Sequence, residues 1–428
     1  MSQQEALEIL KLGYNVLLTG PAGSGKTFVL ESFISGLKFH EKKVAVTATT
    51  GIAATYLKGL TIHSWSGIGI KNTLSAAEIE NLLKRRYLRK RFNRLDVLII
   101  DEVSMLQPET LEMVDILLRE FKKTTEPFGG VQLILSGDFF QLPPVTRENE
   151  KTRYIFESPL WEDLDLKICY LDKPYRQYDN TLIHMLEEIR SNTVTSKTWQ
   201  LLKERFLLPV DSAIAPTKLF THNRYADTYN IQELAKIQEP THVYQMRCFG
   251  NSYYHELLKN SCLSPEKLLL KKGALVMFTK NNLPDGYVNG TTGKVLEFTE
   301  EGYPVIQTFE GKIIQVESVE WVLEEDGEIL AKVRQLPLRL AWAITVHKSQ
   351  GMTLDAVELD LGKSFTNGLG YVALSRVRTL QGIKMRSLNR TALQINPAIM
   401  SLDKKLKEQS EATAAELHSS PWYKKNQR

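Results

Sequence analysis

The stretch Gly20-Pro-Ala-Gly-Ser-Gly-Lys26-Thr27 decides the fold, because it fits the pattern GxxxxGK(S/T) and has the neighbours that this pattern requires. The apolar run from Asn15 to Thr19 before it favours a β-strand, and the run from Phe28 to Leu37 after it favours a helix. Loop N–H groups and the helix N-terminus then face one point, where they favour an anion. A glycine-rich turn can arise by chance, but this context predicts a phosphate-binding loop.

Each part of such a loop has a defined task. The lysine reaches the β- and γ-phosphates of a bound nucleotide, and the hydroxyl that follows it binds Mg²⁺. We therefore expect ATP and Mg²⁺ as ligands, with Lys26 on the phosphates and Thr27 on the metal ion. The other predicted nucleotide contacts belong to the same loop: Gly20, Ala22, Gly23, Ser24 and Gly25.

Length and composition limit the class of protein. With 428 residues the chain exceeds what one core usually organises, which predicts two or three domains. No apolar run reaches about 18 residues, so we expect no membrane span. The N-terminus Met1-Ser-Gln-Gln-Glu5 lacks the parts of a secretory signal, which favours a cytoplasmic protein. The 3 cysteines are too scattered for a disulfide framework or a zinc site: Cys169, Cys248 and Cys262.

The charge distribution bears on possible partners. A net charge of +4 is small for this length, so any nucleic acid would have to be bound by local patches. The run from Lys84 to Arg94 holds seven basic residues. It is either a solvated helix face or a surface that contacts phosphates.

Short apolar runs alternate with helical stretches along much of the chain, which favours parallel sheets covered by helices. The strands expected before residue 172 are Val16–Thr19, Val44–Thr47, Val97–Ile100 and Gln132–Ser136. The clearest strands after residue 173 are Thr217–Thr221, Ala274–Thr279 and Ala356–Leu361. We therefore predict an α/β protein with two mononucleotide-binding-like cores.

Some segments do not fit these cores. Short strands separated by turns favour a small inserted β module with strands at Lys294–Phe298, Pro304–Thr308, Lys312–Gln315 and Ile329–Val333. The stretch from Gly67 to Ser75 is a second insertion, and the chain after about residue 400 is predicted to be a polar helix that forms a solvated cap.

Two further strand ends carry candidate catalytic groups. Asp101 and Glu102 end an apolar strand, where we expect Asp101 to hold Mg²⁺ and Glu102 to orient and deprotonate the attacking water. A carboxylate pair there is often only a solvated strand end, but the upstream loop favours catalysis. Gln141 follows another buried strand at the same sheet edge. It either touches the γ-phosphate or the water, or has no such role.

Several blocks resemble, in order and spacing, the motifs of the PIF-type (petite integration frequency) DNA helicases of superfamily 1B. The similar blocks are Thr47–Ala54, Thr61–Trp65, Ile99–Met105, Pro127–Val145, Pro174–Gln177, Ile344–Gly351 and Tyr371–Arg376. The resemblance covers residues 1 to about 385. It implies two RecA-like (P-loop NTPase) parallel-sheet domains, a short wedge insertion in the first and a small SH3-like β insertion in the second. The implied boundaries are 1–172 for domain 1A with its wedge at about 64–75, 173–290 and 337–400 for domain 2A, 291–336 for domain 2B, and 401–428 for a helical tail.

The resemblance also implies the activity. Such proteins are monomeric ATP-dependent helicases that move 5′ to 3′ on single-stranded DNA and unwind duplexes in replication, recombination, repair or telomere maintenance. The expected partners are single strands and junctions with duplex DNA, with G-quadruplexes left open as substrates. The short N-terminus favours a bacterial or phage-type version.

Individual roles follow from the same resemblance. Gln3 would contact adenine, Gly351 would join the nucleotide contacts, and Arg176 and Arg376 would point at the γ-phosphate. An inserted guanidinium typically contributes about 10³ to 10⁵ in rate. An ordinary surface or ion-pair role is the alternative for each arginine. The implied DNA contacts are Thr49, Thr50, His63, Ser64, Trp65, His347, Lys348 and Ser349, where the Trp65 ring either stacks on a base or packs in the core.

Two other functions remain open at this point. The chain would alternatively be a RecD-like or phage Dda-like helicase of a recombination complex. It would otherwise be a clamp on single-stranded DNA that ATP switches without strand separation. The block Gly137-Asp-Phe-Phe-Gln-Leu-Pro-Pro-Val145 favours the PIF-type function over the other helicases, and two arginines at the nucleotide favour turnover over a slow switch.

Overall fold

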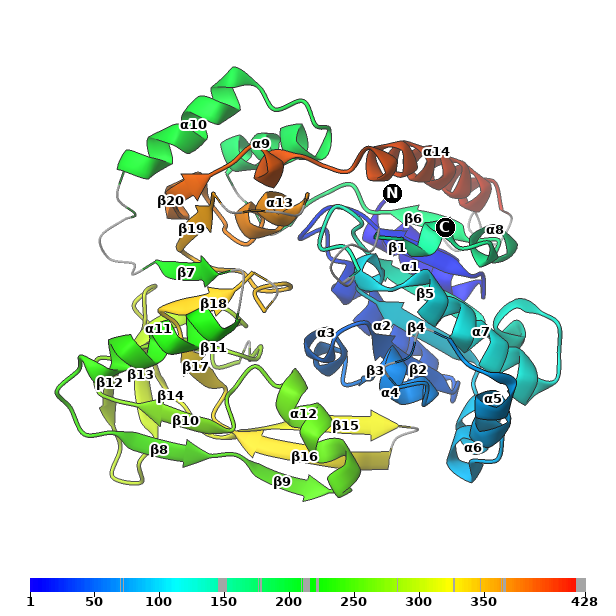
Figure 1. Cartoon of the computed structure of the whole chain (residues 1–428), viewed down its shortest axis with the longest axis horizontal. Coiled ribbons are helices and arrows are strands. Elements are labelled where there is room, and N and C mark those ends of the chain that lie inside the picture. The colour runs from blue at the N-terminus through cyan, green and yellow to red at the C-terminus, as the bar shows by residue number, and fades with distance from the viewer. Residues whose placement is uncertain are drawn as a thin grey trace. The chain divides into compact units, whose positions relative to one another are not determined.

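The computed structural model describes residues 1–69, 71, 73–144, 152–175, 177, 179–208, 210, 216–220, 223–282, 284–325, 328–346, 348–362, 364 and 367–420. The chain divides into two compact units (Figure 1). The first contains Met1–Tyr175, Leu323–Glu328 and Pro397–Arg428, and the second contains Arg176–Val322 and Ile329–Asn396.

The first unit is built on a parallel sheet, as the apolar runs predicted. Its six described strands have the order β3-β2-β4-β5-β1-β6. Their bounds are β1 (Val16–Thr19), β2 (Val44–Ala48), β3 (Leu60–Thr61), β4 (Val97–Asp101), β5 (Gln132–Gly137) and β6 (Lys167–Tyr170). All four runs expected here are strands. Strands β1 and β4 are buried along their whole length, which explains why their sequences do not alternate with polar residues.

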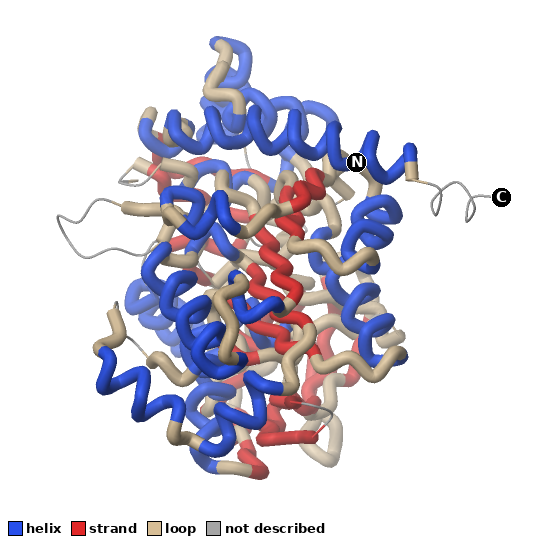
Figure 2. The backbone as a smooth tube through the Cα atoms, turned by 90° about the vertical axis from the view of Figure 1, so that its right-hand side faces the viewer, coloured by secondary structure: helices blue, strands red, loops and turns tan. Residues whose placement is uncertain are grey.

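Helices flank the strands of the molecule (Figure 2), and their apolar side chains complete the core of the first unit. Helix α1 starts with a capping box in which Ser2 and Glu5 bind each other's backbone N–H groups. Apolar side chains of α1 and α2, among them Leu10 and Phe33, are buried against those of the strands. The helices of the unit are α1 (Gln3–Lys11), α2 (Lys26–Phe39), α3 (Gly51–Tyr56), α4 (Ile62–Ser66), α5 (Ala76–Leu83), α6 (Arg86–Asn93), α7 (Pro108–Lys122), α8 (Leu160–Asp163) and α14 (Pro397–Ser419).

The C-terminal helix α14 differs from the solvated cap that we expected. It packs on the edge strand β6 and buries Leu406 and Leu417. The Ser410 hydroxyl accepts a hydrogen bond from the Tyr170 N–H at 3.0 Å, and the Tyr170 hydroxyl donates to Asp403 at 2.8 Å. The helix therefore covers this edge of the sheet and supplies the partner of the Tyr170 N–H.

The second unit contains a smaller parallel sheet. Its four described strands have the order β18-β7-β19-β20, with bounds β7 (Thr217–Phe220), β18 (Ala343–Thr345), β19 (Val357–Leu361) and β20 (Ile383–Leu388). The runs expected at Thr217–Thr221 and Ala356–Leu361 correspond to β7 and β19. The helices of the unit are α9 (Asn180–Arg190), α10 (Ser196–Leu207), α11 (Asn223–Ala235), α12 (His255–Ser261) and α13 (Leu369–Leu374). Two parallel α/β sheets agree with the predicted pair of RecA-like cores.

The run Ala274–Thr279 corrects one assignment. It forms strand β11 (Leu275–Phe278), but this strand pairs antiparallel with β12 and β17 and does not enter the parallel sheet. The antiparallel sheet has the order β14-β13-β12-β11-β17, with β12 (Thr292–Phe298), β13 (Pro304–Thr308), β14 (Ile313–Gln315) and β17 (Leu338–Leu340). Smaller sheets are formed by β8 (His242–Gln245) with β10 (Lys267–Leu270), and by β15 (Val319–Glu325), β16 (Glu328–Gln335) and β9 (Arg247–Gly250).

Two searches of the described residues gave negative results. None of their helices is long and apolar enough to cross a membrane. Within the same residues, no three His, Cys, Asp or Glu side chains gather into a group that could hold a metal ion.

Candidate functional site

The predicted phosphate-binding loop lies between β1 and α2 and needs its glycines. Gly20, Gly23 and Gly25 have φ values of +142°, +82° and +88°, which L side chains rarely adopt. A Cβ at Gly20 would lie 2.3 Å from the Leu171 carbonyl oxygen, and one at Gly25 would lie 2.0 Å from the Gln3 Nε2 atom. The loop can therefore curl closely only with glycine at these positions.

The loop holds a cation and an unsatisfied hydroxyl. The Lys26 Nζ atom donates to the carbonyl oxygens of Gly20 at 2.9 Å and Pro21 at 3.1 Å, so the ammonium is bent back over the loop. The Ser24 hydroxyl is buried and has no hydrogen-bond partner among the described residues. Thr27 is exposed at the start of α2. These groups fit a bound nucleotide phosphate with a hydroxyl left for a metal ion.

Two side chains from elsewhere in the unit lie against this loop. The Gln3 side-chain amide donates to the Ser24 carbonyl oxygen at 3.0 Å, which places the predicted adenine contact beside the phosphate loop. The Tyr175 N–H donates to the Gly23 carbonyl oxygen at 2.8 Å, and Tyr175 is 57% exposed. Sequence reasoning missed Tyr175, whose only signal was an aromatic residue inside the Pro174–Gln177 block.

The two candidate catalytic carboxylates follow β4. Asp101 is buried, and this burial raises the pKa of its carboxyl although nearby Lys26 acts to lower it. A cation at this position would offset the cost of burying the carboxylate, as expected for a metal ligand. Glu102 has φ 55° and ψ 43°, a left-handed conformation that is strained for a glutamate.

Thr49 connects the predicted DNA-contacting segment to these carboxylates. Its N–H donates to the Asp101 carbonyl oxygen at 3.2 Å, and its hydroxyl donates to the Glu102 carbonyl oxygen at 2.9 Å. Thr49 follows β2, the direct neighbour of β4 in the sheet. One residue therefore bonds to the backbone of both members of the acidic pair, including the strained Glu102.

Gln141 lies inside a tight turn after β5. It is 6% exposed, and its side-chain amide donates to Asp138 Oδ2 at 3.3 Å. Asp138 Oδ1 accepts from the Phe140 N–H at 3.2 Å, so this aspartate organises the turn. Sequence reasoning did not assign a role to Asp138. In the described structure Gln141 bonds to this turn, and its contact with a phosphate or a water stays a prediction.

The remaining predicted DNA contacts of the first unit are Thr50, which directly precedes α3, and His63 and Ser64, which lie on α4. The Thr50 hydroxyl accepts from the Ala53 N–H at 3.3 Å at the start of α3. On α4, the Ser64 hydroxyl accepts from the Thr61 hydroxyl at 3.0 Å. Burial lowers the pKa of His63 on the same helix, so its imidazole is neutral at pH 7. All three side chains are partly exposed.

Trp65 lies in the core. It is 2% exposed, and its ring stacks on Phe92 with 4.7 Å between ring centroids, while Phe92 contacts Phe121 at 4.6 Å. This is the core-packing alternative from the sequence analysis. A base cannot reach a ring that is covered in this way, so we do not carry the base-stacking role forward.

In the second unit, three of the predicted motifs meet at Arg376. This side chain is 1% exposed, and its guanidinium donates to the Val372 carbonyl oxygen at 3.0 Å and to the Ser375 hydroxyl at 2.9 Å. The Gln177 side chain donates to the Ser375 carbonyl oxygen at 2.9 Å. Ser349 contributes a carbonyl oxygen 3.5 Å from Arg376 Nη1. The arginine is therefore held inside its own unit in the described structure.

The fifth motif shows a mixture of exposed and buried residues. Ser349 is fully buried and its hydroxyl donates to the Val346 carbonyl oxygen at 2.8 Å, so it does not present a group for DNA here. Lys348 is partly buried, and this burial, together with the charge of Arg339, lowers the pKa of its ammonium. Gly351 is exposed with φ +79°. The predicted site residues Arg176 and His347 lie outside the described residues.

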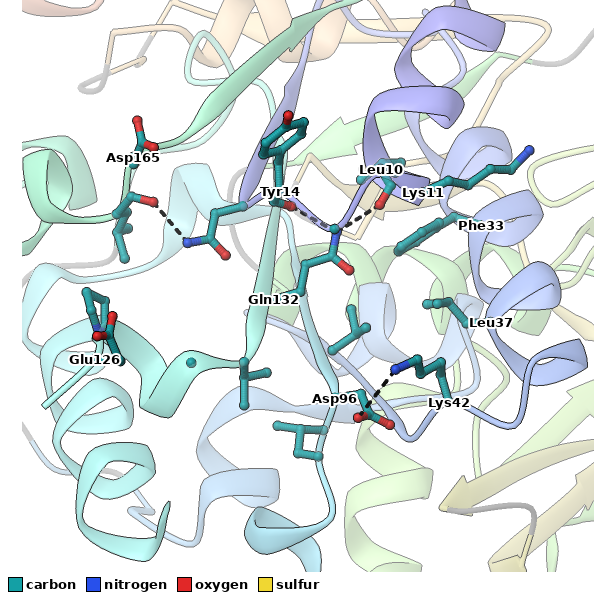
Figure 3. Close-up of a pocket in the computed structure, with 18 of the residues that line it drawn as sticks. Leu10, Lys11, Tyr14, Phe33, Leu37, Lys42, Asp96, Glu126, Gln132 and Asp165 are labelled. Atoms are coloured by element: carbon teal, nitrogen blue, oxygen red, sulfur yellow. Dashed lines mark hydrogen bonds and ion pairs between the residues drawn. The ribbon is translucent and has the colours of Figure 1, made fainter. Parts of the chain in front are cut away.

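A separate cavity of about 1130 Å³ lies at the amino-terminal ends of the strands of the first sheet, opposite the ends that carry the phosphate loop (Figure 3). It is lined by residues at the starts of the strands, such as Val97 and Gln132. The Gln132 amide donates to the carbonyl oxygens of Leu10 and Tyr14, both at 2.8 Å. Because the phosphate loop follows the carboxyl end of β1, this cavity is not the predicted nucleotide site.

Comparison with known proteins agrees with the geometry of the phosphate loop. The pattern of the PIF1-like helicase family matches residues 3–199, and that of the 2B domain of the DNA helicase Pif1 matches residues 254–298. The chain is 40% identical to the ATP-dependent DNA helicase Pif1 of Psychrobacter sp. (strain PRwf-1), over 96% of this chain and 71% of that relative.

Solved structures support the same relationship. The crystal structure of Bacteroides sp Pif1 in complex with ADP-AlF4 aligns with a TM-score of 0.83 and 30% identity, over 95% of this chain and 96% of that one. Bacteroides Pif1 bound to single-stranded DNA aligns with a TM-score of 0.64 and 31% identity, over 95% and 96% of the two chains. The agreement extends over nearly the whole sequence, from the phosphate loop to the last motif, and the chain belongs to the PIF1-like helicase family.

Proposed function

We propose that this chain is an ATP-dependent DNA helicase that translocates 5′ to 3′ on single-stranded DNA and unwinds duplex DNA. The observation that carries the proposal is the arrangement at one strand edge of the first unit. There Lys26 lies near the Asp101 carboxylate, and Thr49 bonds to the backbone of Asp101 and Glu102. Nucleotide chemistry and the predicted strand contact thus share one set of hydrogen bonds.

The residues at the carboxyl ends of these strands have separate roles in ATP hydrolysis. Lys26 and the loop N–H groups bind the phosphates, while Glu102 orients a water and accepts its proton. Thr27 and Asp101 would hold Mg²⁺, which supplies charge neutralisation at the phosphates when bound. We further propose that Gln3 and Gly351 contact the nucleotide, that Gln141 contacts the γ-phosphate or the water, and that Arg176 and Arg376 stabilise charge on the γ-phosphate.

On the DNA side we propose contacts with backbone phosphates through hydroxyl, imidazole and ammonium groups. The proposed residues are Thr49, Thr50, His63, Ser64, His347 and Lys348. The substrates would be single strands and junctions, with G-quadruplexes as a further class, and the protein would act as a monomer inside the cell. The domain boundaries of the sequence analysis, including the wedge and the SH3-like module, are part of this proposal.

Unwinding of partial duplexes tests activity and polarity together. The substrates carry either a 5′ or a 3′ single-stranded tail and are incubated with and without ATP. We expect ATP-dependent separation of the 5′-tailed duplex only. The Glu102→Gln variant serves as control, because it should bind ATP without hydrolysing it and should leave the duplex intact.

The other outcomes are equally informative. Separation of the 3′-tailed duplex alone would overturn the proposed direction of travel. ATP-dependent changes in affinity for single strands without any strand separation would identify the switched clamp. Equal hydrolysis by the Glu102→Gln variant would remove Glu102 from its proposed role as base.

A further inference from the structure

The side chain of Gln3 reaches the phosphate loop from the first turn of helix α1. Its Nε2 atom donates to the Ser24 carbonyl oxygen at 3.0 Å. The fit is tight, because a Cβ at Gly25 would lie 2.0 Å from the same Nε2 atom. The place of this amide at the loop therefore depends on where the first turn of α1 is held.

The Gln3 amide has groups left for a nucleotide. Among the described residues its side chain makes the one hydrogen bond to the Ser24 carbonyl oxygen, which leaves its second N–H and its oxygen. A glutamine amide that offers both groups can pair with the N7 atom and the exocyclic amine of adenine. This chemistry agrees with the adenine contact expected of Gln3.

Glu5 fixes the turn that carries Gln3. The Glu5 Oε2 atom accepts hydrogen bonds from the Ser2 N–H at 2.7 Å and from the Ser2 hydroxyl at 2.8 Å. The Glu5 N–H in turn donates to the Ser2 hydroxyl at 3.2 Å, which completes the capping box of α1. Gln3 lies between these two residues in the chain, so the box constrains its backbone.

Helix α14 binds the other oxygen of the same carboxylate. The His418 Nε2 atom lies 2.6 Å from the Glu5 Oε1 atom, and it is the donor because an ionised carboxylate only accepts. The neighbouring Leu417 is buried in the core cluster that contains Ala6 and Ile9 of α1. Polar and apolar contacts therefore join the end of α14 to α1.

The bond from His418 to Glu5 differs in its position from a second ion pair of α14. Lys167 and Glu416, which are 2.7 Å apart, join the helix to β6. The bond from His418 instead ends on the turn that carries Gln3, and the Glu5 side chain is 18% exposed. Exposed ion pairs are usually worth little, so the effect of this one depends on what it positions.

We propose that α14, through the bond from His418 to Glu5, positions Gln3 for the adenine of the bound nucleotide. This inference rests on the proposed function, which places ATP at the phosphate loop. His418 and Glu5 are positioning residues, because each acts on the nucleotide through Gln3. The inference assigns α14 a role in nucleotide affinity in addition to covering β6.

Substitutions on both sides of the bond test the inference. His418→Ala removes the donor, and Glu5→Gln removes the charge while a glutamine at this position still serves the capping box. Glu416→Gln is the matched control, because it weakens the bond from α14 to Lys167 and leaves α1 unchanged. ADP with a fluorescent group on its ribose is bound to each variant and displaced by ADP or by purine riboside diphosphate, which lacks the exocyclic amine.

We expect His418→Ala to bind ADP about four-fold more weakly, with a similar loss in Glu5→Gln. Purine riboside diphosphate should lose less than about two-fold, because it offers no amine to the Gln3 oxygen. The Glu416→Gln control should bind both nucleotides like the unchanged protein. In a Gln3→Ala background, His418→Ala should cause no further loss, because the side chain that it positions is absent.

Several results would overturn the inference. They are an unchanged ADP affinity in His418→Ala, an equal loss in the Glu416→Gln control, or a further loss in the Gln3→Ala background. An equal loss for the two nucleotides would also overturn it, since it would show a general weakening of the loop.

The proposed function is judged separately, by strand separation with the unchanged protein. Normal ADP binding without strand separation would count against the helicase. Normal strand separation, together with an unchanged ADP affinity in His418→Ala, would count against the positioning role alone.

Discussion

The two units hold their predicted site residues in opposite ways. At the strand edge of the first unit, the glycine loop is already curled and the Ser24 hydroxyl lacks a partner among the described residues. In the second unit, Ser349 and Arg376 are fully buried and their polar groups bond to backbone and side-chain oxygens of the same unit. The first unit therefore presents a curled loop with an unpaired hydroxyl, whereas the second unit keeps its predicted site residues buried.

This difference indicates where a conformational change is needed. The loop glycines have positive φ values, which hold the backbone of the loop in its curled form. The Arg376 guanidinium bonds to the Val372 carbonyl and the Ser375 hydroxyl, and the contact with the γ-phosphate that we propose would require it to leave both groups. Reaching a nucleotide would then cost those bonds, so nucleotide contacts and movement in the second unit would be coupled.

The largest expected effect comes from Arg376→Ala. Loss of a guanidinium that stabilises the γ-phosphate should reduce the rate of DNA-stimulated ATP hydrolysis by about 10³- to 10⁵-fold. The melting temperature should also fall, because each buried acceptor left unpaired costs about 1–3 kcal/mol. Steady-state kinetics and thermal unfolding measure the two effects. A lower melting temperature with normal hydrolysis would show that Arg376 is only a structural side chain and would break the comparison.

Lys26→Ala should reduce hydrolysis by about 10²- to 10³-fold, as expected for the loss of one preorganised charge at the reacting phosphates. Binding of single-stranded DNA should be retained, since Lys26 contacts the loop. Lys42→Ala is the matched control, because Lys42 lines the cavity at the opposite strand edge. Normal turnover in Lys26→Ala would remove the phosphate site from the first unit.

Thr49→Val tests whether the hydrogen bond from Thr49 to Glu102 links DNA binding to ATP hydrolysis in the first unit. The substitution removes the hydroxyl that donates to the Glu102 carbonyl oxygen. One such hydrogen bond is worth about 1 kcal/mol, so the ratio of DNA-stimulated to basal hydrolysis should fall about five-fold. Thr49→Ser keeps the hydroxyl and should restore the ratio. Equal ratios in the Val and Ser variants would show that this bond does not transmit DNA binding.

The smallest expected effect is on stability and depends on pH. Burial raises the pKa of Asp101, so its ionised form is disfavoured in the folded state. The stability that the protonated carboxyl contributes is present below the unfolded pKa of about 3.9 and is lost as the pH rises through the folded pKa. Asp101→Asn should therefore raise the melting temperature at pH 7 in the absence of nucleotide, and this gain should shrink towards pH 4. Thermal unfolding at both pH values measures it, and a less stable variant at pH 7 would contradict it.

Much of the fold could be predicted because buried parallel strands have continuous apolar sequences. The runs at Val16–Thr19, Val97–Ile100 and Ala356–Leu361 all form strands near their expected bounds. The run Ala274–Thr279 also forms a strand, but its partners are antiparallel. An apolar run of this length is compatible with either kind of sheet, because the pairing depends on distant segments.

The residues of the candidate site also divide into those placed by local sequence and those placed by contacts with distant segments. Lys26, Asp101 and Glu102 belong to local patterns whose neighbours determine their position at the strand edge. Trp65 and Ser349 were predicted DNA contacts, yet both are buried. The burial of Trp65 depends on Phe92 and Phe121, which lie far along the chain. Its own motif therefore contained no sign that the ring would be covered.

The sequence by itself determined the phosphate loop, the acidic strand end and the order of the motifs, because these features depend on residues close together in the chain. Only the tertiary structure decided that Thr49 bonds to the acidic pair, that Arg376 is held within its own unit and that α14 covers β6. These contacts join segments that are far apart in the sequence. These contacts form through burial and hydrogen bonding in the complete fold. A local stretch of sequence therefore does not reveal them.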